Sequence, residues 1–353
     1  MSIQAALDLA FKNNPELRLA GLAVDKAQIQ RDNAFDLVDY FPPLGLGDFM
    51  FNQVFNAYQQ AEIGLNTAQK GEEAAADKLT KDVVEAYTGA LTDYNNMKSM
   101  ELTVKNIRDL HVVSSVASQI GFISPYDFDG SITGLQQAEE GYRAMQRAYE
   151  GSIANLASLL GQHPDWDPVL TSKPLITNFE RGDLTSDIIQ GSSESVLVWT
   201  KKALLDIEKS KENWFLPGLT SEEKQIDKTT AELNYEDAKR TSRLLIEQMY
   251  YGIETIEGQI KMAELVYKKA LKDEEVARLK YEVGLIPKLS IVPGAESLEA
   301  KVLDVSQAEI KLDNLKLQLA NLKSQYKFMI GEEVFAGDDW TAPPVSEDEA
   351  DKK

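Results

Sequence analysis

The chain contains no cysteine, and only two of its 353 residues are histidine. Without cysteine, disulfide bonds, thiolate zinc sites and thiol nucleophiles are excluded. His111 and His163 stand far apart without metal-ligand spacing, and no glycine-rich phosphate loop is present. Carboxylate pairs occur, but among 57 acidic residues they arise by chance. We therefore predict that the protein is not an enzyme and that it holds no metal and no cofactor.

Long apolar runs are also missing, and the 37 basic residues are outnumbered by 57 acidic ones. No run reaches the roughly 18 apolar residues of a membrane-spanning helix. The first seven residues lack the basic and apolar regions of a signal peptide, so either the protein is cytosolic or such a signal has been removed. The formal net charge of −20 argues against nucleic acid as a partner, because phosphate binding needs a stripe of Lys and Arg.

Glycine and proline are confined to a handful of points, as expected of long uninterrupted helices. Residues 52–119 contain no proline, and their apolar residues recur at three- and four-residue spacing. This pattern predicts one helix about 100 Å long. Residues 221–281 predict a second long helix, with Ser221 as its N-cap. Shorter helices are predicted at 15–40, 126–161, 196–213 and 295–331.

The sequence also repeats itself. A shift of 163 residues brings segment 120–123 onto segment 283–286, and a shift of 170 brings Gly161 onto Gly331. A shift of 180 aligns residues of the short helices that precede the two long ones. Because these matches keep a common order, the chain is predicted to consist of two tandem repeats.

The repeat divides the chain into four parts. Residues 1–161 and 184–331 are predicted to be two helical-hairpin repeats, and residues 162–183, which contain three prolines, to be the linker between them. The acidic tail, residues 332–353, is predicted to be disordered. The predicted fold class is all-α, with two tandem repeats of long antiparallel helical hairpins that pack like coiled coils.

Four motifs now support a resemblance to a known family. They are the opening segment 3–17, the turns at 120–124 and 283–286, and the Leu-Leu-Gly ending at 159–161 with its looser copy at 329–331. Their order and duplication resemble the TolC family of outer-membrane efflux proteins over most of residues 2–331. The resemblance implies a homotrimer in which twelve helices form an α-barrel around a tunnel. It also implies a location in the cell envelope, a periplasmic adaptor (membrane fusion) protein and an inner-membrane pump as partners.

One feature of that family is missing. Its membrane β-barrel is closed by hairpins that would lie at 41–51 and 214–220, between the first short helix and the long helix of each repeat. A membrane hairpin needs roughly twenty residues or more, and neither segment has them. We predict that the β-barrel is absent, either by nature or by engineering.

The turns between helices, the helix tips, are the best functional candidates. By the resemblance they dock the adaptor, whereas the simpler alternative is that their glycines only cap helices. The tip residues are Gly121, Phe122, Ile123, Ser124, Val283, Gly284, Leu285 and Ile286. Asp127 and Asp129 are candidates for acids at the tunnel entrance, although the second tip has Lys288 where another acid would be expected.

A second candidate lies at the opposite end of the predicted rod. Its short connections carry the apolar residues Phe41, Leu44, Leu46, Phe49, Phe51, Trp214, Phe215 and Leu216. These side chains either plug the end of the helical bundle or form a patch in weak contact with a membrane or another envelope layer.

These features favour a passive tunnel component of a TolC-like tripartite efflux system that docks its adaptor through the helix tips. The alternative is a non-conducting coiled-coil spacer or tether of the cell envelope. A cytosolic scaffold would leave the family resemblance unexplained.

Overall fold

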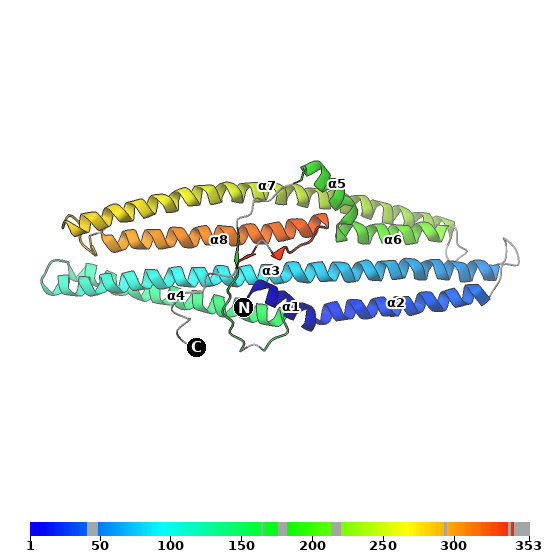
Figure 1. Ribbon diagram of the computed structural model, residues 1–353, viewed down its shortest axis with the longest axis horizontal. Helices are drawn as coiled ribbons and strands as arrows, with labels where there is room; N and C mark the ends of the chain where they lie inside the picture. The colour runs from blue at the N-terminus through cyan, green and yellow to red at the C-terminus, as the bar shows by residue number, and fades with distance from the viewer. Residues whose placement is uncertain are drawn as a thin grey trace.

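The computed structural model describes residues 1–40, 49–163, 165–175, 182–212, 220–292, 295–337 and 340–341. They form an elongated bundle of helices (Figure 1). The two longest helices are α3 (Phe49–Gln119) and α7 (Ser221–Glu282), with 71 and 62 residues. Among the described residues the only strands are β1 (Lys173–Pro174) and β2 (Trp340–Thr341), so the all-α prediction is confirmed. No helix in this part of the chain combines the length and apolar character needed to cross a membrane.

Each long helix has two shorter antiparallel partners. In the first repeat, α2 (Pro15–Tyr40) and α4 (Pro125–Leu159) pack on successive halves of α3. In the second, α6 (Val196–Glu212) and α8 (Leu298–Ile330) pack on α7 in the same order. The predicted fold class of tandem antiparallel helical hairpins is therefore confirmed, and α3 and α8 join the two hairpins side by side.

Two helices were missed from the sequence. The short helices α1 (Ile3–Asn13) and α5 (Leu184–Glu194) precede α2 and α6, and they were missed because each has only 11 residues. Equivalent helices here start 181 residues apart, so the predicted shift of 180 is one residue too small. One residue turns a helix by about 100°. Accordingly Val198, with 1% of its surface exposed, takes the inward place of Leu17, while Leu197 is 38% exposed.

The predicted N-cap of α7 is also off by one residue. The cap is Thr220, whose Oγ1 accepts a hydrogen bond from the Glu223 backbone N–H at 3.2 Å. In return the Glu223 carboxylate accepts the Thr220 backbone N–H at 2.8 Å and the Thr220 hydroxyl at 2.9 Å, and these two bonds lower the pKa of Glu223. This reciprocal capping box needs Glu three residues after the cap, which selects Thr220 rather than Ser221.

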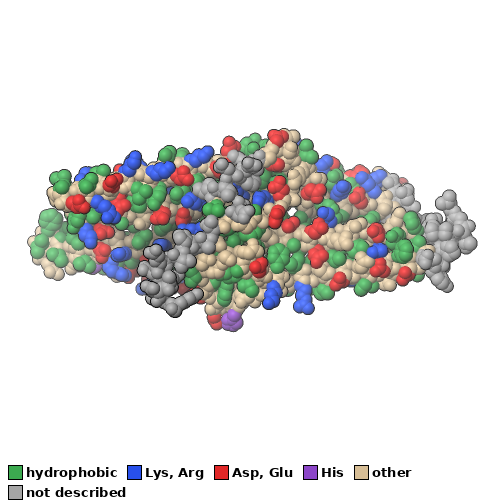
Figure 2. Space-filling model, in the orientation of Figure 1, with side chains coloured by type: hydrophobic (Ala, Val, Ile, Leu, Met, Phe, Trp, Pro, Cys, Tyr) green, Lys and Arg blue, Asp and Glu red, His purple; other side chains and the backbone are tan. Residues whose placement is uncertain are grey.

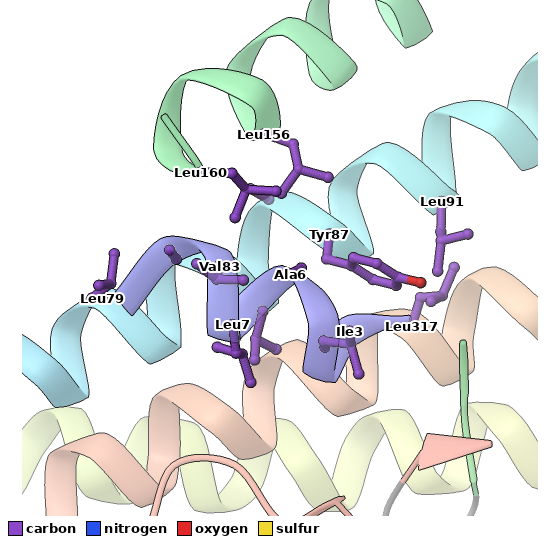
Figure 3. Close-up of a cluster of buried hydrophobic side chains, with 13 residues drawn as sticks. Ile3, Ala6, Leu7, Leu79, Val83, Tyr87, Leu91, Leu156, Leu160 and Leu317 are labelled. Atoms are coloured by element: carbon purple, nitrogen blue, oxygen red, sulfur yellow. The ribbon is translucent and has the colours of Figure 1, made fainter. Parts of the chain in front are cut away.

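An apolar cluster at the middle of the first repeat surrounds Tyr87 (Figure 3). The fully buried Tyr87 hydroxyl donates to the Met1 carbonyl at 2.9 Å and accepts the Ser172 backbone N–H at 3.0 Å. The Trp340 ring meets it edge-on at 6.0 Å between centroids. Three segments distant in sequence therefore meet on one side chain.

Two of these segments form what we call the belt: residues 165–175 of the linker, and residues 332–337 with 340–341. Strands β1 and β2 pair antiparallel within it, with Lys173 opposite Thr341. Val334 is buried. The described start of the predicted disordered tail is therefore packed on the body, because its apolar residues cover α3 and α8. Residues 342–353 lie outside the described part.

The second repeat has its own apolar cluster, around Ile246, Ile253 and Ile330. It differs from the first at one buried contact. Where the first repeat has the apolar Ala6 and Leu156, the equivalent residues of the second are Asp187 and Tyr326, and the Tyr326 hydroxyl donates to the Asp187 carboxylate. Burial, together with Asp187, raises the pKa of Tyr326 far above its usual range.

Candidate functional site: the helix tips

The first tip is a tight reversal between α3 and α4. Gly121 has a φ of 73°, and the N–H of Phe122 donates to the Ala117 carbonyl at 2.8 Å. This left-handed ending satisfies the last carbonyls of α3. Ser124 then caps α4, because its Oγ accepts the Asp127 N–H at 3.1 Å while the Asp127 carboxylate accepts the Ser124 hydroxyl at 2.7 Å. The whole reversal needs only residues 120–124.

The second tip begins in the same way. Gly284 has a φ of 77°, and the N–H of Leu285 donates to the Lys280 carbonyl at 2.8 Å. A Cβ built on Gly121 or Gly284 would meet no atom within 4 Å. The positive φ, rather than lack of room, therefore requires glycine at both positions. This supports the capping alternative for the glycines themselves, so a docking role depends on the apolar residues beside them.

The second tip then departs from the first, because α8 starts only at Leu298. The intervening chain, of which residues 285–292 and 295–297 are described, is called the strap here. Its base is fixed by two ion pairs, Lys280 Nζ to Glu296 Oε2 at 2.7 Å and Lys288 Nζ to Glu299 Oε1 at 3.5 Å. Lys288 thus pairs within its own hairpin.

The apolar tip residues are strongly exposed. Phe122 and Leu285, equivalent by the shift of 163, are 70% and 74% exposed, and Tyr126 is 86% exposed. The next pair, Ile123 and Ile286, is half-buried. Figure 2 shows hydrophobic side chains gathered at this end of the molecule. Large apolar groups exposed together in this way are typical of a surface that binds a partner.

Both predicted acids lie beside an open groove of about 1200 Å³, which we call the tip groove. Asp127 and Asp129 line it together with Phe122 from the first tip and Leu289 and Val292 from the strap. The Asp127 carboxylate is engaged in capping α4, whereas Asp129 is exposed at its side. Their position at a tunnel entrance stays a prediction.

The two histidines have local partners. His111 Nδ1 lies 3.0 Å from Ser131 Oγ, and its ring stacks on Phe128 with 5.5 Å between centroids. This contact fixes α3 against α4. His163 is exposed in the linker, with Nδ1 3.2 Å from Asp165 Oδ2. Across the described ranges, no three potential metal ligands of the His, Cys, Asp or Glu type come together.

Most of the predicted apolar residues at the opposite end belong to the undescribed segments of the chain. Phe41, Leu44, Leu46, Trp214, Phe215 and Leu216 lie outside the described residues, as do most of the segments judged too short for membrane hairpins. Phe49 and Phe51 belong to the first turn of α3, but their side chains lie outside the described part.

The sequence reading missed two apolar stripes on the edges of the molecule. α7 forms one edge, and α2 with α4 forms the other, because α3, α6 and α8 lie between them. On α7 the exposed residues Leu244, Tyr251, Leu265 and Leu279 are separated by multiples of seven. On α2 Leu22 and Ile29 are exposed seven residues apart. We call these the edge stripes; their seven-residue spacing was the signal that could have revealed them.

The chain was compared with known protein families, curated proteins and solved structures, and only the solved structures are similar to it. No known family profile and no curated protein matches the chain. The outer-membrane channel OprN is similar with a TM-score of 0.71 at 12% identity, covering 94% of this chain and 90% of that chain. The Campylobacter jejuni outer-membrane channel CmeC has a TM-score of 0.63 at 15% identity, covering 93% and 85%. The Vibrio cholerae outer-membrane protein VceC has 0.63 at 15%, covering 94% and 97%.

At these identities the likeness establishes the fold. The described helices have the arrangement of TolC-like outer-membrane channels, which confirms the fold expected from the sequence resemblance.

Proposed function

We propose that this chain, which has the fold of outer-membrane channels, is the passive tunnel component of an efflux or export system in the cell envelope. The observation that carries the proposal is the combination of that fold with apolar surface exposed where a channel would need it, at the tips and along both edges. A separate inner-membrane pump would supply the energy, and this chain would make and break no bond.

The edge stripes support a ring of copies. In the tip half of one chain α4, α3, α8 and α7 lie side by side in that order, and in the other half α2, α3, α6 and α7 do so. If α7 of one copy packs on α2 and α4 of the next, both stripes are buried. Three copies of such a four-helix layer give the twelve-helix tunnel of a homotrimer.

The tips support docking of a periplasmic adaptor. Phe122, Tyr126 and Leu285 present apolar surface at the end where the chain reverses, and the tip groove lies between the first tip and the strap. An adaptor with an apolar surface would cover these residues. Asp127 and Asp129 would then stand beside the tunnel entrance.

An export assay tests the proposal. In cells that depend on this chain, Phe122→Asp combined with Leu285→Asp should abolish export, because a carboxylate cannot be buried in an apolar contact without a partner. The matched control is Ile189→Asp on α5, an exposed apolar residue remote from the tips. Circular dichroism should show that all variants keep their helices.

Export that persists in the tip variant would refute docking through these residues. Loss of export in the control as well would show that the assay reports folding rather than docking.

A further inference from the structure

A second groove, of about 530 Å³, runs along the seam between α3 and α8, and we call it the seam trough. Uncharged polar side chains dominate its lining, namely Thr92, Asn96 and Ser99 on α3 and Gln307, Gln318 and Asn321 on α8. Asp93 and Lys311 contribute one charge of each sign. For a chain with a net charge of −20, this stretch of surface is unusually neutral.

Amide hydrogen bonds set the trough in place. Asn95 Nδ2 donates to Asn314 Oδ1 at 2.9 Å, and Asn314 Nδ2 donates to Asn96 Oδ1 at 3.0 Å. These bonds tie the two repeats together through side chains that are half-buried. They fix the position of α3 relative to α8 along the helix axes, so the neighbouring amides and hydroxyls keep defined positions.

The seam trough and the tip groove lie on one face of the molecule. Along α3 their lining includes Thr88, Thr92, Asn96, Ser99, Asn106, Leu110 and Ser114, with the adjacent Gly89, Asp93, Ile107 and His111 at its side. Steps of three, four and seven residues keep a single helix face. On α8, Ala300 of the tip groove lies seven residues before Gln307 of the trough. The trough therefore leads toward the tip groove.

The belt covers the opposite face. On α3, Tyr87 contacts the belt, whereas Asn96 lines the trough. On α8, Lys323 lies against the belt, whereas Asn314 lines the trough. The members of each pair are nine residues apart, which is two and a half turns of helix. The two faces of the α3–α8 layer are thus distinct, one covered by an added layer of chain and one open and polar.

We propose that the seam trough is the inner wall of the tunnel midway along its length, and that the solutes it accommodates are uncharged and rich in hydrogen-bonding groups, such as polyhydroxyl compounds. The first part rests on the proposed ring. A closed ring of one helical layer has more room outside than inside, so the belt fits on the outside and the trough faces inward.

The class of solute follows from the lining. Amides and hydroxyls both donate and accept, so they exchange hydrogen bonds with a polyhydroxyl solute as water does. A charged solute that gives up part of its water meets no net charge of opposite sign here, because Asp93 and Lys311 balance each other. The wall is therefore matched to neutral polar solutes.

Single cysteines test both parts, because the chain has none of its own. Gln318→Cys places a thiol in the trough, and Glu309→Cys, nine residues earlier on α8, places one on the opposite face; both native residues are exposed. The oligomeric state of each sample is measured by light scattering. Each thiol is then treated with a polymer-linked maleimide and with small neutral, anionic and cationic thiosulfonates.

In the assembled protein, position 318 should lose reactivity toward the polymer but keep it toward the small reagents, while position 309 reacts with all. Relative to the unfolded chain, the neutral reagent should modify position 318 fastest, with the two charged reagents slowed to a similar extent. A charged wall would instead favour one sign by about tenfold or more.

Polymer labelling of both positions in a sample that light scattering shows to be oligomeric would overturn the inward placement alone. A strong preference for one charge would overturn the solute class. A monomer would overturn the proposed ring and the inference with it.

Discussion

At the residue scale, glycine has two different structural roles in this chain. Gly121 and Gly284 adopt positive φ values at the helix tips, and Gly161 and Gly331 do so at the ends of α4 and α8. Residues with a Cβ are strained there. Other glycines, such as Gly258 in α7, sit within helices with open space around them. Only the first kind is needed for the chain to reverse.

Gly121→Ala and Gly258→Ala should therefore have opposite effects on stability. The first should lower the free energy of unfolding by about 1–2 kcal/mol through left-handed strain. The second should raise it by about 0.5–1 kcal/mol, because alanine loses less backbone entropy in a helix. Denaturant titration of both variants measures the difference. Equal effects would contradict the assignment of Gly121 as the obligatory turn residue.

The buried pair Tyr326 and Asp187 gives the second repeat a polar contact that the first lacks. The raised pKa of Tyr326 means that its neutral form contributes stability fully below the unfolded pKa of about 10. That contribution is lost as the pH rises from there toward the folded pKa. Tyr87 and Tyr149 also have raised pKa values, so Tyr326 supplies only part of the alkaline dependence.

Tyr326→Phe should have two effects. At neutral pH the Asp187 carboxylate loses its donor in a buried site, which lowers the free energy of unfolding by about 1–3 kcal/mol. Above about pH 10 the stability of the variant should fall less steeply with pH than that of the parent chain. Denaturant titrations across this range check both, with Tyr126→Phe at the exposed first tip as control. An unchanged alkaline slope would contradict the role assigned to Tyr326.

At the element scale, the two repeats solve one packing problem with different side chains. In the second repeat Gly191 of α5 lies against Ile246 of α7. The equivalent residues of the first repeat are Ala10 of α1 and Val83 of α3, which belong to one buried cluster. A Cβ on Gly191 would lie 2.3 Å from Ile246 Cδ1 and 3.1 Å from the Met329 carbonyl oxygen. Relative to the first repeat, the residue on the short helix is smaller (Gly instead of Ala) and the residue on the long helix is larger (Ile instead of Val).

Gly191→Ala should accordingly destabilise the chain by about 1–3 kcal/mol through overpacking. Adding Ile246→Val removes the clashing methyl group and reproduces the pair of the first repeat, so the double variant should recover most of the loss. Ile246→Val alone should cost about 0.5–1.5 kcal/mol. A double-mutant cycle by denaturant titration measures the coupling. Simple additivity would show that the two side chains do not compete for the same space.

At the scale of the whole molecule, exposed apolar side chains are arranged in register along the edge stripes and are grouped at the tips. An isolated copy leaves Tyr251 and Leu265 on α7 in water, although their seven-residue register is that of a helix seam. Packing of like copies edge to edge would bury them. The assembly is thus part of the proposed function.

Light scattering should give a mass of three chains of 39.3 kDa each. Tyr251→Lys combined with Leu265→Lys should convert this trimer to monomer, because two charges would be buried in an apolar contact. Glu309→Lys makes the same change in net charge on the outward face of α8 and should leave the trimer intact. A parent chain that stays monomeric would favour the spacer or tether.

Much of the fold was predictable because it is local. Turn glycines and helix periodicity depend on residues close together in sequence, and the internal repeat shows the same local patterns a second time. Together they located α2, α3, α4, α6, α7 and α8 to within a few residues. The short α1 and α5 were not predicted, because 11 residues give a weak periodic signal. The tip residues were identified by their spacing, but their exposure could be measured only in the folded chain.

The sequence by itself determined the all-helical repeats and the two glycine reversals that place Phe122 and Leu285 at one end. Their cause is backbone conformation and hydrophobic spacing, which act over a few residues. Tertiary structure alone decided that the linker and the start of the tail meet on Tyr87, that Asp187 pairs with Tyr326, and that amides line the seam between α3 and α8. These contacts join residues many turns apart, and the packing of whole helices decides which of them meet.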